Sequence, residues 1–361
     1  MKMNFNIYKN KTVVVTGHTG FKGSWLTQWL VLLGAKVVGI SNDIPSRPSH
    51  FESMNLKNKI INKKIDIRDL NILKKVFSKY KPDFVFHLAG QAIVKRSFAE
   101  PIYTWQTNTI GTLNVLESMR KFKKKCIVVL ITSDKTYKNL EIKRGYKEND
   151  LLGGNDPYSA SKAGAEMAIQ SSIKSFYPLK NTNVFISVAR AGNVIGGGDW
   201  SNERLIPDCI RSWSKNRNVY LRNPKSTRPW QHVLEAIYGY LLLAEKLKKS
   251  KKLHGEVFNF GPNNNDDHSV VHVVNTMKKY WKKVSWKVIG SNKVKFYESS
   301  LLKLNSNKAK SKLKWKCILT FSETIKMVID WYISFYTKPK NIVTVHQIKE
   351  YEKLLERRRV K

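Results

Sequence analysis

Residues 11–23 read Lys11-Thr-Val-Val-Val-Thr-Gly17-His-Thr-Gly20-Phe-Lys-Gly23. The β-branched run predicts a buried parallel strand that ends at the first glycine, and residues 24–33 have the apolar content of a helix. A glycine loop between a strand and a helix is typical of a dinucleotide site, because glycine lets the backbone approach a pyrophosphate and the helix N-terminus offers positive N–H groups. A tight turn without a ligand is the alternative. The predicted cofactor contacts in this loop are Gly17, Thr19, Gly20, Phe21 and Gly23.

The next strands extend this prediction. A second strand is expected over residues 35–40, and Asp43 follows it about 20 residues after the last glycine. An acid there can bond the ribose 2′-hydroxyl, which favours NAD over NADP, although a role in the turn alone is the alternative. Further cofactor contacts are predicted where the following two strands end, at Asp66, Ile67, Leu88 and Ala89, and later in the chain at Tyr158 and Lys162.

The segment Tyr158-Ser-Ala-Ser-Lys162 places a phenol and an ammonium group four residues apart in a predicted helix, so both leave the same helical face. Lys162 is expected to lower the pKa of Tyr158 and make it a proton acceptor near neutral pH. Alone, such a pattern is usually a surface pair. Here it follows a buried strand that delivers Ser133 at its C-terminal end, where open α/β sheets bind ligands. With the glycine loop, these residues predict an oxidoreductase site.

The order of elements predicts the fold. Strands and helices alternate up to about residue 190, which indicates a Rossmann-like α/β fold with a doubly wound parallel sheet. The sequence then becomes irregular and rich in Arg, Asn, Pro and Trp, which we interpret as a smaller C-terminal substrate-binding lobe. We expect residues 1–190 to form the cofactor domain with 231–262 returning to it, 191–230 and 263–337 to form the lobe, and 338–361 to be a polar, helical or frayed tail.

The predicted lobe contains three arginines that suit a diphosphate, because a guanidinium group offers two directed donors. They are Arg204, Arg222 and Arg228, and three solvated surface arginines are the alternative. The remaining predicted substrate contacts lie in the same segments and are Asn193, Leu205 and His232.

The net charge of +38 favours a polyanion partner such as nucleic acid or an acidic membrane. The lysines are scattered, however, and no nucleic-acid-binding motif accompanies them, so a solvated lysine-rich surface is the preferred interpretation and neither partner is expected. Cys126, Cys209 and Cys317 follow neither a zinc pattern nor a disulfide pattern, which predicts no metal site and a reducing cytoplasm. No signal peptide or membrane span is predicted.

The chain resembles the sugar-nucleotide dehydratases of the extended short-chain dehydrogenase/reductase family. The matching segments are residues 14–25, 133–135, 156–163, 190–200 and 228–235, and together they span most of the chain. The runs Gly196-Gly-Gly-Asp-Trp200 and Arg228-Pro-Trp-Gln-His-Val-Leu-Glu235 are typical of the branch that acts on CDP-glucose. The resemblance implies NAD as cofactor, CDP-glucose as substrate, and a cytoplasmic lyase of deoxysugar biosynthesis, such as that for the lipopolysaccharide O-antigen.

The resemblance also implies a role for each residue. Tyr158, supported by Lys162 and Ser133, takes the proton of the 4-hydroxyl while C4 gives a hydride to NAD. Asp134 protonates the departing 6-hydroxyl as C5 loses its proton, and hydride return to C6 gives a 4-keto-6-deoxy sugar. Lys135 either removes a proton or positions the sugar, and an ion pair with Asp134 would silence both residues.

The sequence leaves other functions open. An NAD-dependent nucleotide-sugar 4-epimerase would share the glycine loop and the Tyr/Lys pair but has no use for an acid at Asp134, and a dehydratase of another nucleotide sugar also fits. A basic protein that binds nucleic acid or a membrane on the same fold is a remote alternative. Residues 294–305 depart from the family pattern, which leaves the fine substrate preference open.

Two predicted helices bear on oligomeric state. The helix over residues 103–120 and the helix that carries Tyr158 both have an apolar face. Such helices commonly form the dimer contact in folds of this kind, which implies a homodimer or higher homo-oligomer, although core packing explains the pattern equally well.

Overall fold

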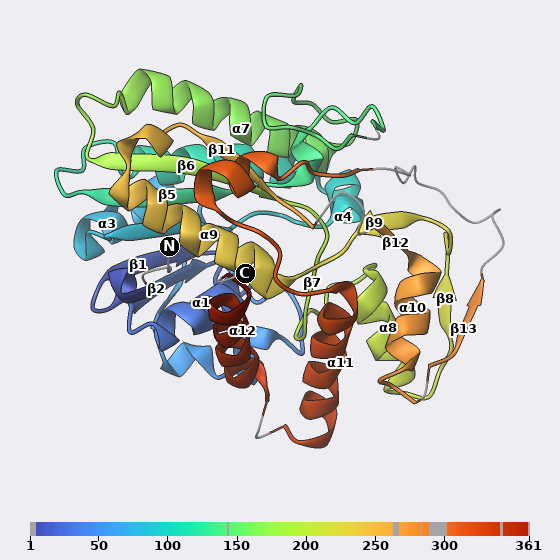
Figure 1. Ribbon diagram of the computed structural model, residues 1–361. Helices are drawn as coiled ribbons and strands as arrows, with labels where there is room; N and C mark the ends of the chain where they lie inside the picture. The colour runs from blue at the N-terminus through green and yellow to red at the C-terminus, as the bar shows by residue number, and fades with distance from the viewer. Residues whose placement is uncertain are drawn as a thin grey trace.

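A seven-stranded parallel sheet forms the centre of the computed structural model, which describes residues 5–142, 144–262, 267–282, 284–288, 302–339 and 342–359 (Figure 1). The strand order is β11-β6-β5-β4-β1-β2-β3, and all neighbours run parallel. The predicted doubly wound parallel sheet is confirmed. The strands are β1 (Thr12–Thr16), β2 (Lys36–Ser41), β3 (Ile61–Lys64), β4 (Phe84–His87), β5 (Cys126–Ile131), β6 (Val184–Ala191) and β11 (Val257–Phe260).

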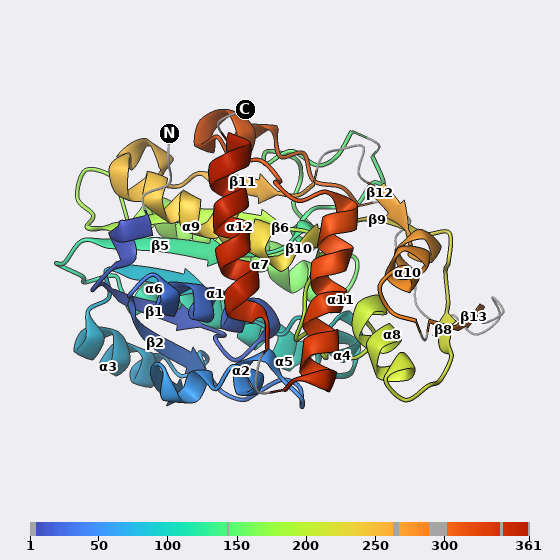
Figure 2. The same ribbon diagram turned by 60° about the horizontal axis from the view of Figure 1, so that its bottom comes forward.

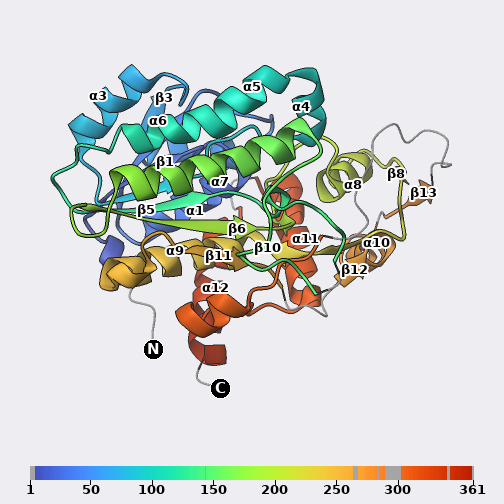
Figure 3. The same cartoon turned by 90° about the horizontal axis from the view of Figure 1, so that it is seen from above.

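Helices cover both faces of this sheet (Figure 3). One face packs under α3 (Leu70–Tyr80), α6 (Gly111–Glu117) and α7 (Pro157–Phe176), and the other packs under α1 (Phe21–Leu32) and α9 (Val233–Lys249). Because successive strand residues point to opposite faces, Val14 joins the first core, whereas Val13 and Val15 join the second. Burial on both faces explains why the strands read as continuous apolar runs. Three shorter helices are α2 (His50–Ser53), α4 (Val94–Ala99) and α5 (Pro101–Trp105).

A smaller region lies beside the main sheet and contains α8 (Leu205–Trp213) and α10 (Val270–Lys278) (Figure 1). Among its described residues, the strands form three short pairs, of which β9 with β12 is antiparallel and the other two are parallel. The pairs are β7 (Val194–Ile195) with β10 (Gln231–His232), β8 (Val219–Leu221) with β13 (Trp286–Val288), and β9 (Thr227–Pro229) with β12 (Asp267–Ser269). Residues 294–301, part of the segment that departs from the family pattern, lie outside the described residues.

The C-terminal region forms two helices that run side by side, α11 (Phe321–Thr337) and α12 (Thr344–Arg359) (Figure 2). Helix α12 belongs to the segment expected to be a helical or frayed polar tail, yet Ile348, Tyr351 and Leu355 are buried. The indole of Trp29 on α1 donates a hydrogen bond to Glu352 at 2.8 Å. This polar segment is therefore a packed part of the fold. Across the ranges that the structure describes, no helix combines the length and apolar content needed to cross a membrane.

Glu235, in the first turn of α9, has a buried carboxyl group that joins the C-terminal region to this helix. Its Oε1 accepts hydrogen bonds from the backbone N–H groups of Ile318 and Leu319, both at 2.7 Å. Its Oε2 accepts a hydrogen bond from the hydroxyl of Tyr351 at 2.7 Å. Burial raises the pKa of Glu235 to about 7, although these donors oppose the rise.

We expect Glu235 to make the free energy of unfolding fall as the pH rises from about 4.5 to about 7. The folded protein keeps a proton on this carboxyl group that the unfolded chain releases, so the loss is about 3 kcal/mol over that range. Urea denaturation of the wild type and of Glu235→Gln across this pH range measures the effect. The wild type should lose more stability than the variant, and parallel pH profiles would contradict the assignment.

Candidate active site

The glycine loop between β1 and α1 leaves no room for a side chain at Gly17 or at Gly23. Gly17 has a φ angle of +75°, and a Cβ atom there would meet the backbone nitrogen of Ala89 at 2.6 Å. A Cβ atom at Gly23 would meet the carbonyl oxygen of Gly17 at 2.0 Å. Helix α1 begins at Phe21 without a side-chain cap, so the N–H groups of its first turn can receive an anion.

A cavity of about 810 Å³ lies over the C-terminal ends of the parallel strands. The hydroxyl of Thr19 donates a hydrogen bond to the backbone carbonyl of Asp43 at 2.6 Å, which holds the glycine loop against the end of β2. Asp66 follows β3 and pairs with Arg68 at 2.7 Å. Each predicted cofactor contact lines this cavity: Gly17, Thr19, Gly20, Phe21, Gly23, Asp43, Asp66, Ile67, Leu88, Ala89, Tyr158 and Lys162.

This part of the cavity fits a dinucleotide. The glycine loop leaves a concave backbone surface at a helix N-terminus, which suits a pyrophosphate. After β4, a Cβ atom at Gly90 would meet both the Nζ atom of Lys162 and the Oδ1 atom of Asn108 at 2.9 Å. The missing side chain therefore makes room for the lysine amine against the floor of the cavity. Within the described residues, no group of three or more His, Cys, Asp and Glu side chains could hold a metal ion.

The five residues predicted to be catalytic meet in the same cavity: Ser133, Asp134 and Lys135 after β5, and Tyr158 and Lys162 on α7. Asp156 starts α7 by accepting a hydrogen bond from the N–H of Ser159 at 2.9 Å, which places the tyrosine in the first turn. The hydroxyl of Ser133 donates to the carboxylate of Asp134 at 2.9 Å. Asp134 and Lys135 both lie among the residues that the structure describes, and their side chains form no ion pair with each other.

The pKa of Tyr158 does not follow the direction predicted from its spacing to Lys162. Burial raises the pKa of Tyr158 above its ordinary value, while Ser133 and Arg204 oppose this rise. The prediction of a lowered pKa is corrected because removal from water disfavours the phenolate more than these groups favour it. Burial also lowers the pKa of Lys162 to about 8, against the opposing charge of Glu166.

Five of the residues predicted to contact the substrate also line the cavity: Asn193, Arg204, Leu205, Arg222 and Arg228. Arg204 pairs with Asp199 at 3.0 Å, and Arg228 donates to the backbone carbonyl of Thr227 at 2.8 Å. Three arginines therefore line the same cavity as the glycine loop and the Tyr/Lys pair.

His232, the remaining predicted substrate contact, does not reach this cavity. It is fully buried, and its Nδ1 atom accepts a hydrogen bond from the N–H of Leu234 at 3.3 Å. Its ring lies edge-on to Trp25, with the ring centroids 6.0 Å apart. His232 is the N-cap residue of α9, and its side chain packs in the core instead of lining the cavity.

Lys22 and Asp199 line the cavity although the sequence predicted neither as a site residue. Burial, together with the charges of Arg204 and Lys162, lowers the pKa of Lys22 to about 8. Asp199 is almost fully buried and forms an ion pair with the guanidinium group of Arg204. Each charged residue stands inside a glycine-rich run, and a charge in such a run is the signal that could have identified it.

The fold and the cavity define a class of protein: a Rossmann-type α/β protein with the dinucleotide loop and the Ser, Tyr and Lys residues of the short-chain dehydrogenases and reductases. The family model "GDP-mannose 4,6 dehydratase" matches residues 14–328, and the chain belongs to this family. The resemblance to sugar-nucleotide dehydratases is thus confirmed, and the chain is an enzyme of this kind.

Individual relatives agree with this assignment. The chain is 42% identical to the CDP-glucose 4,6-dehydratase of Salmonella typhimurium over 331 residues, which covers 91% of this chain and 92% of the relative. An epimerase structure from Methanothermobacter thermautotrophicus superposes with a TM-score of 0.78 at 24% identity, covering 93% of this chain and 96% of that one. The dTDP-glucose 4,6-dehydratase of Bacillus anthracis in complex with NAD gives 0.73 at 22% identity, with 90% and 97% covered. These two structures share the fold.

Proposed function

We propose that the protein is an NAD-dependent dehydratase that converts CDP-glucose to CDP-4-keto-6-deoxyglucose. The observation that carries the proposal is the carboxylate of Asp134 next to Ser133, in the cavity that Tyr158 and Lys162 also line. Dehydration of a sugar needs an acid at the same ring as the oxidoreductase pair. The 42% identity to the Salmonella typhimurium CDP-glucose 4,6-dehydratase supports the choice of nucleotide sugar.

Oxidation at C4 depends on Tyr158. The phenolate oxygen accepts the proton of the 4-hydroxyl, and the hydroxyl of Ser133 holds the same sugar oxygen by a hydrogen bond. The hydroxyl of Ser133 and the charge of Arg204 oppose part of the rise that burial causes in the pKa of Tyr158. Lys162 supports the tyrosine in this proposal from one helical turn further along the same face of α7. When bound, NAD supplies the hydride acceptor for C4 and returns the hydride to C6.

Loss of water depends on Asp134. The 4-keto group acidifies the proton on C5, because the resulting carbanion is an enolate. A base takes the C5 proton, the electron pair of that C–H bond forms the C5=C6 double bond, and the bond between C6 and its oxygen breaks. Asp134, in its protonated form, gives its proton to the departing hydroxyl, which becomes water, and the base returns the proton to C5 when C6 receives the hydride. Lys135 has two proposed roles, as the base that takes the C5 proton when neutral or as a group that positions the sugar.

Three arginines of the cavity hold the nucleotide part of the substrate in this proposal. Arg204, Arg222 and Arg228 bind the diphosphate, for which their planar donor groups are suited. Asn193 and Leu205 complete the substrate contacts on the same side of the cavity.

A panel of nucleotide sugars tests the proposal. The purified protein with NAD is incubated with CDP-, dTDP-, GDP- and UDP-glucose, and mass spectrometry detects the loss of one water. CDP-glucose labelled with deuterium at C4 should lose water and carry the label at C6. A product of unchanged mass with the configuration at C4 inverted would identify a 4-epimerase, and water loss from another nucleotide sugar alone would reassign the substrate.

We further propose that the enzyme works in the cytoplasm, where its product serves the synthesis of deoxysugars such as those of lipopolysaccharide O-antigen.

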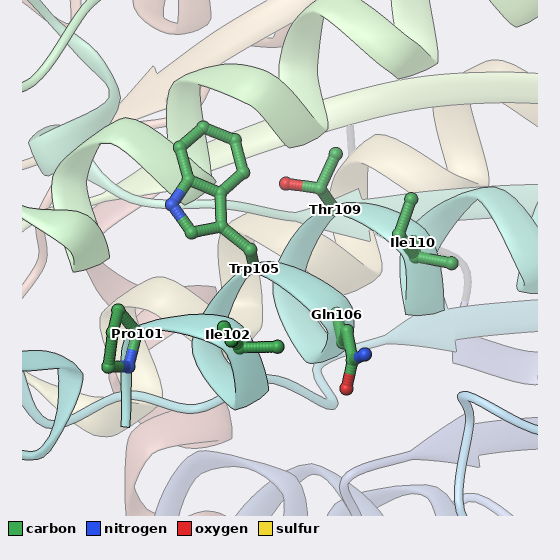
Figure 4. Close-up of a pocket in the computed structure, with 6 residues that line it drawn as sticks. All are labelled: Pro101, Ile102, Trp105, Gln106, Thr109 and Ile110. Atoms are coloured by element: carbon green, nitrogen blue, oxygen red, sulfur yellow. The ribbon is translucent and has the colours of Figure 1, made fainter. Parts of the chain in front are cut away.

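We also propose that the enzyme is a homodimer. The support for a dimer is an exposed apolar patch on α5 and the following π-helical turn (Gln106–Ile110), shown in Figure 4, together with the exposed Met167 on α7. Ile102 is 72% exposed and Met167 is 64% exposed. The indole of Trp105 on α5 packs against α7 at Gly164, because a Cβ atom on this glycine would lie 2.8 Å from the indole ring. A second copy that presents the same patch would cover these side chains in a two-fold arrangement.

We expect Ile102→Glu together with Met167→Glu to weaken dimerisation by about 30-fold or more, because two charges from each protomer would be buried in an apolar contact. Sedimentation velocity over a concentration series measures the association. Leu179→Glu is the matched control, since Leu179 is 45% exposed and lies beyond the C-terminal end of α7. A wild type that sediments as a monomer at micromolar concentration, or a double variant that associates normally, would contradict the proposed contact.

A further inference from the structure

An ion pair between Glu166 and Arg190 is buried behind the catalytic residues. Both side chains are excluded from solvent, at 0% and 1% exposure. The guanidinium of Arg190 on β6 binds both oxygens of the Glu166 carboxylate on α7, through Nε at 2.7 Å and through Nη2. The two groups therefore join α7 to the neighbouring strand with fixed geometry.

Three more segments are tied to this pair. The hydroxyl of Thr132, at the end of β5, donates to the Oε1 atom of Glu166 at 2.6 Å. The Nη1 atom of Arg190 donates to the hydroxyl of Tyr137 at 2.6 Å and to the backbone carbonyl of Glu148 at 3.1 Å. The guanidinium also stacks over the Tyr137 ring, 4.6 Å from its centroid.

Three members of this network are close neighbours in sequence of catalytic residues. Thr132 precedes Ser133, Tyr137 follows the short helical turn Asp134–Thr136, and Glu166 lies one helical turn after Lys162. The network thus connects the two segments that carry the acid and the oxidoreductase pair, although none of its side chains lines the cavity, apart from Thr132.

We propose that Glu166 and Arg190 are positioning residues that act through Thr132: they hold the end of β5 against α7, so that Ser133 and Asp134 face Tyr158 at the same sugar ring. This inference rests on the proposed function. A rigid connection matters there because the acid and the tyrosine act on different carbons of one substrate, and small displacements of reacting groups cost rate.

The free-energy cost of burying this ion pair favours a positioning role over a purely stabilising role. Removing two charges from water is costly, and buried ion pairs replaced by apolar residues of similar size often leave stability unchanged or improve it. The charge of Glu166 has a second effect on the site, because it raises the pKa of Lys162 against the influence of burial. The carboxylate thereby favours the ammonium form of the lysine.

Two sets of variants test the proposal. Thr132→Val removes one hydroxyl and leaves the ion pair in place; we expect kcat for water loss to fall about tenfold with KM unchanged, and Thr132→Ser to restore it. Glu166→Met together with Arg190→Met removes both charges without leaving one unpaired; we expect a folded protein whose kcat is about 100-fold lower. Thr276→Val on α10, which removes a buried hydroxyl that donates to the carbonyl of His272 at 2.8 Å, should change neither constant.

The outcomes separate this proposal from the proposed function. Thermal unfolding and NAD binding are measured for each variant to establish that it is folded. If the wild type turns over the nucleotide sugar and Thr132→Val, or the folded double variant, keeps the wild-type kcat, the positioning role is overturned while the proposed function stands. If Thr132→Ser fails to restore the rate, transmission through the hydroxyl is overturned. A wild type that oxidises no nucleotide sugar overturns both.

Discussion

Replacing Tyr158 with phenylalanine should slow oxidation of the sugar at C4 by about 10²- to 10⁴-fold, because the variant has no phenolic oxygen to accept the 4-hydroxyl proton. The phenyl ring keeps the buried apolar surface, and Lys162 stays against Gly90, so the folded state and NAD binding should be retained. Single-turnover mixing of enzyme, NAD and CDP-glucose, followed by absorbance of the reduced cofactor, measures this step directly.

Tyr336→Phe is a matched control for the loss of a phenol. Tyr336 lies on α11, is 43% exposed and does not line the cavity, so the variant should oxidise the sugar at the wild-type rate. Normal turnover by Tyr158→Phe would refute the whole catalytic scheme, since no other step of it could proceed without oxidation at C4.

Asp134→Asn should separate the two halves of the reaction. The amide has nearly the shape of the carboxyl group but cannot deliver a proton to the departing 6-hydroxyl, so water loss should fall by about 10²- to 10⁴-fold while oxidation at C4 continues. Reduced cofactor should then accumulate in single turnover, and mass spectrometry should find little dehydrated sugar.

The opposite behaviour of the two variants makes the assignment specific. Tyr158→Phe should form reduced cofactor about 10²- to 10⁴-fold more slowly than the wild type, whereas Asp134→Asn should form it and retain it. Dehydration by Asp134→Asn at the wild-type rate would show that another group is the acid. Interconversion of the C4 epimers by both the wild type and this variant, with no water lost from either, would favour the epimerase alternative.

Much of the fold and site follows from short stretches of sequence. The run from Lys11 to Gly23 predicts strand, loop and helix, because a buried β-branched strand and a glycine turn are set by nearest neighbours. The four-residue spacing of Tyr158 and Lys162 places both on one helical face in any helix. The structure brings these residues into one cavity because parallel strands all end on the same side of the sheet.

Other features depend on segments far apart in the chain. His232 follows an arginine-rich run that suggested substrate contact, yet it packs beside Trp25, about 200 residues earlier in the sequence. The pKa of Tyr158 rises because of the burial that tertiary packing creates, and no local spacing contains that information. The Glu166–Arg190 pair and the docking of α12 on α1 likewise arise from contacts between distant elements.

The sequence by itself determined the dinucleotide loop, the parallel sheet and the spacing of the Tyr/Lys pair, because strand, turn and helix geometry act over a few residues. Only the tertiary structure decided that Lys22 and Asp199 line the cavity, that His232 does not, and that Asp134 forms no ion pair with Lys135. The reason is that burial and charge neighbours are properties of the packed chain, and they set which side chains can meet a substrate and in which protonation state.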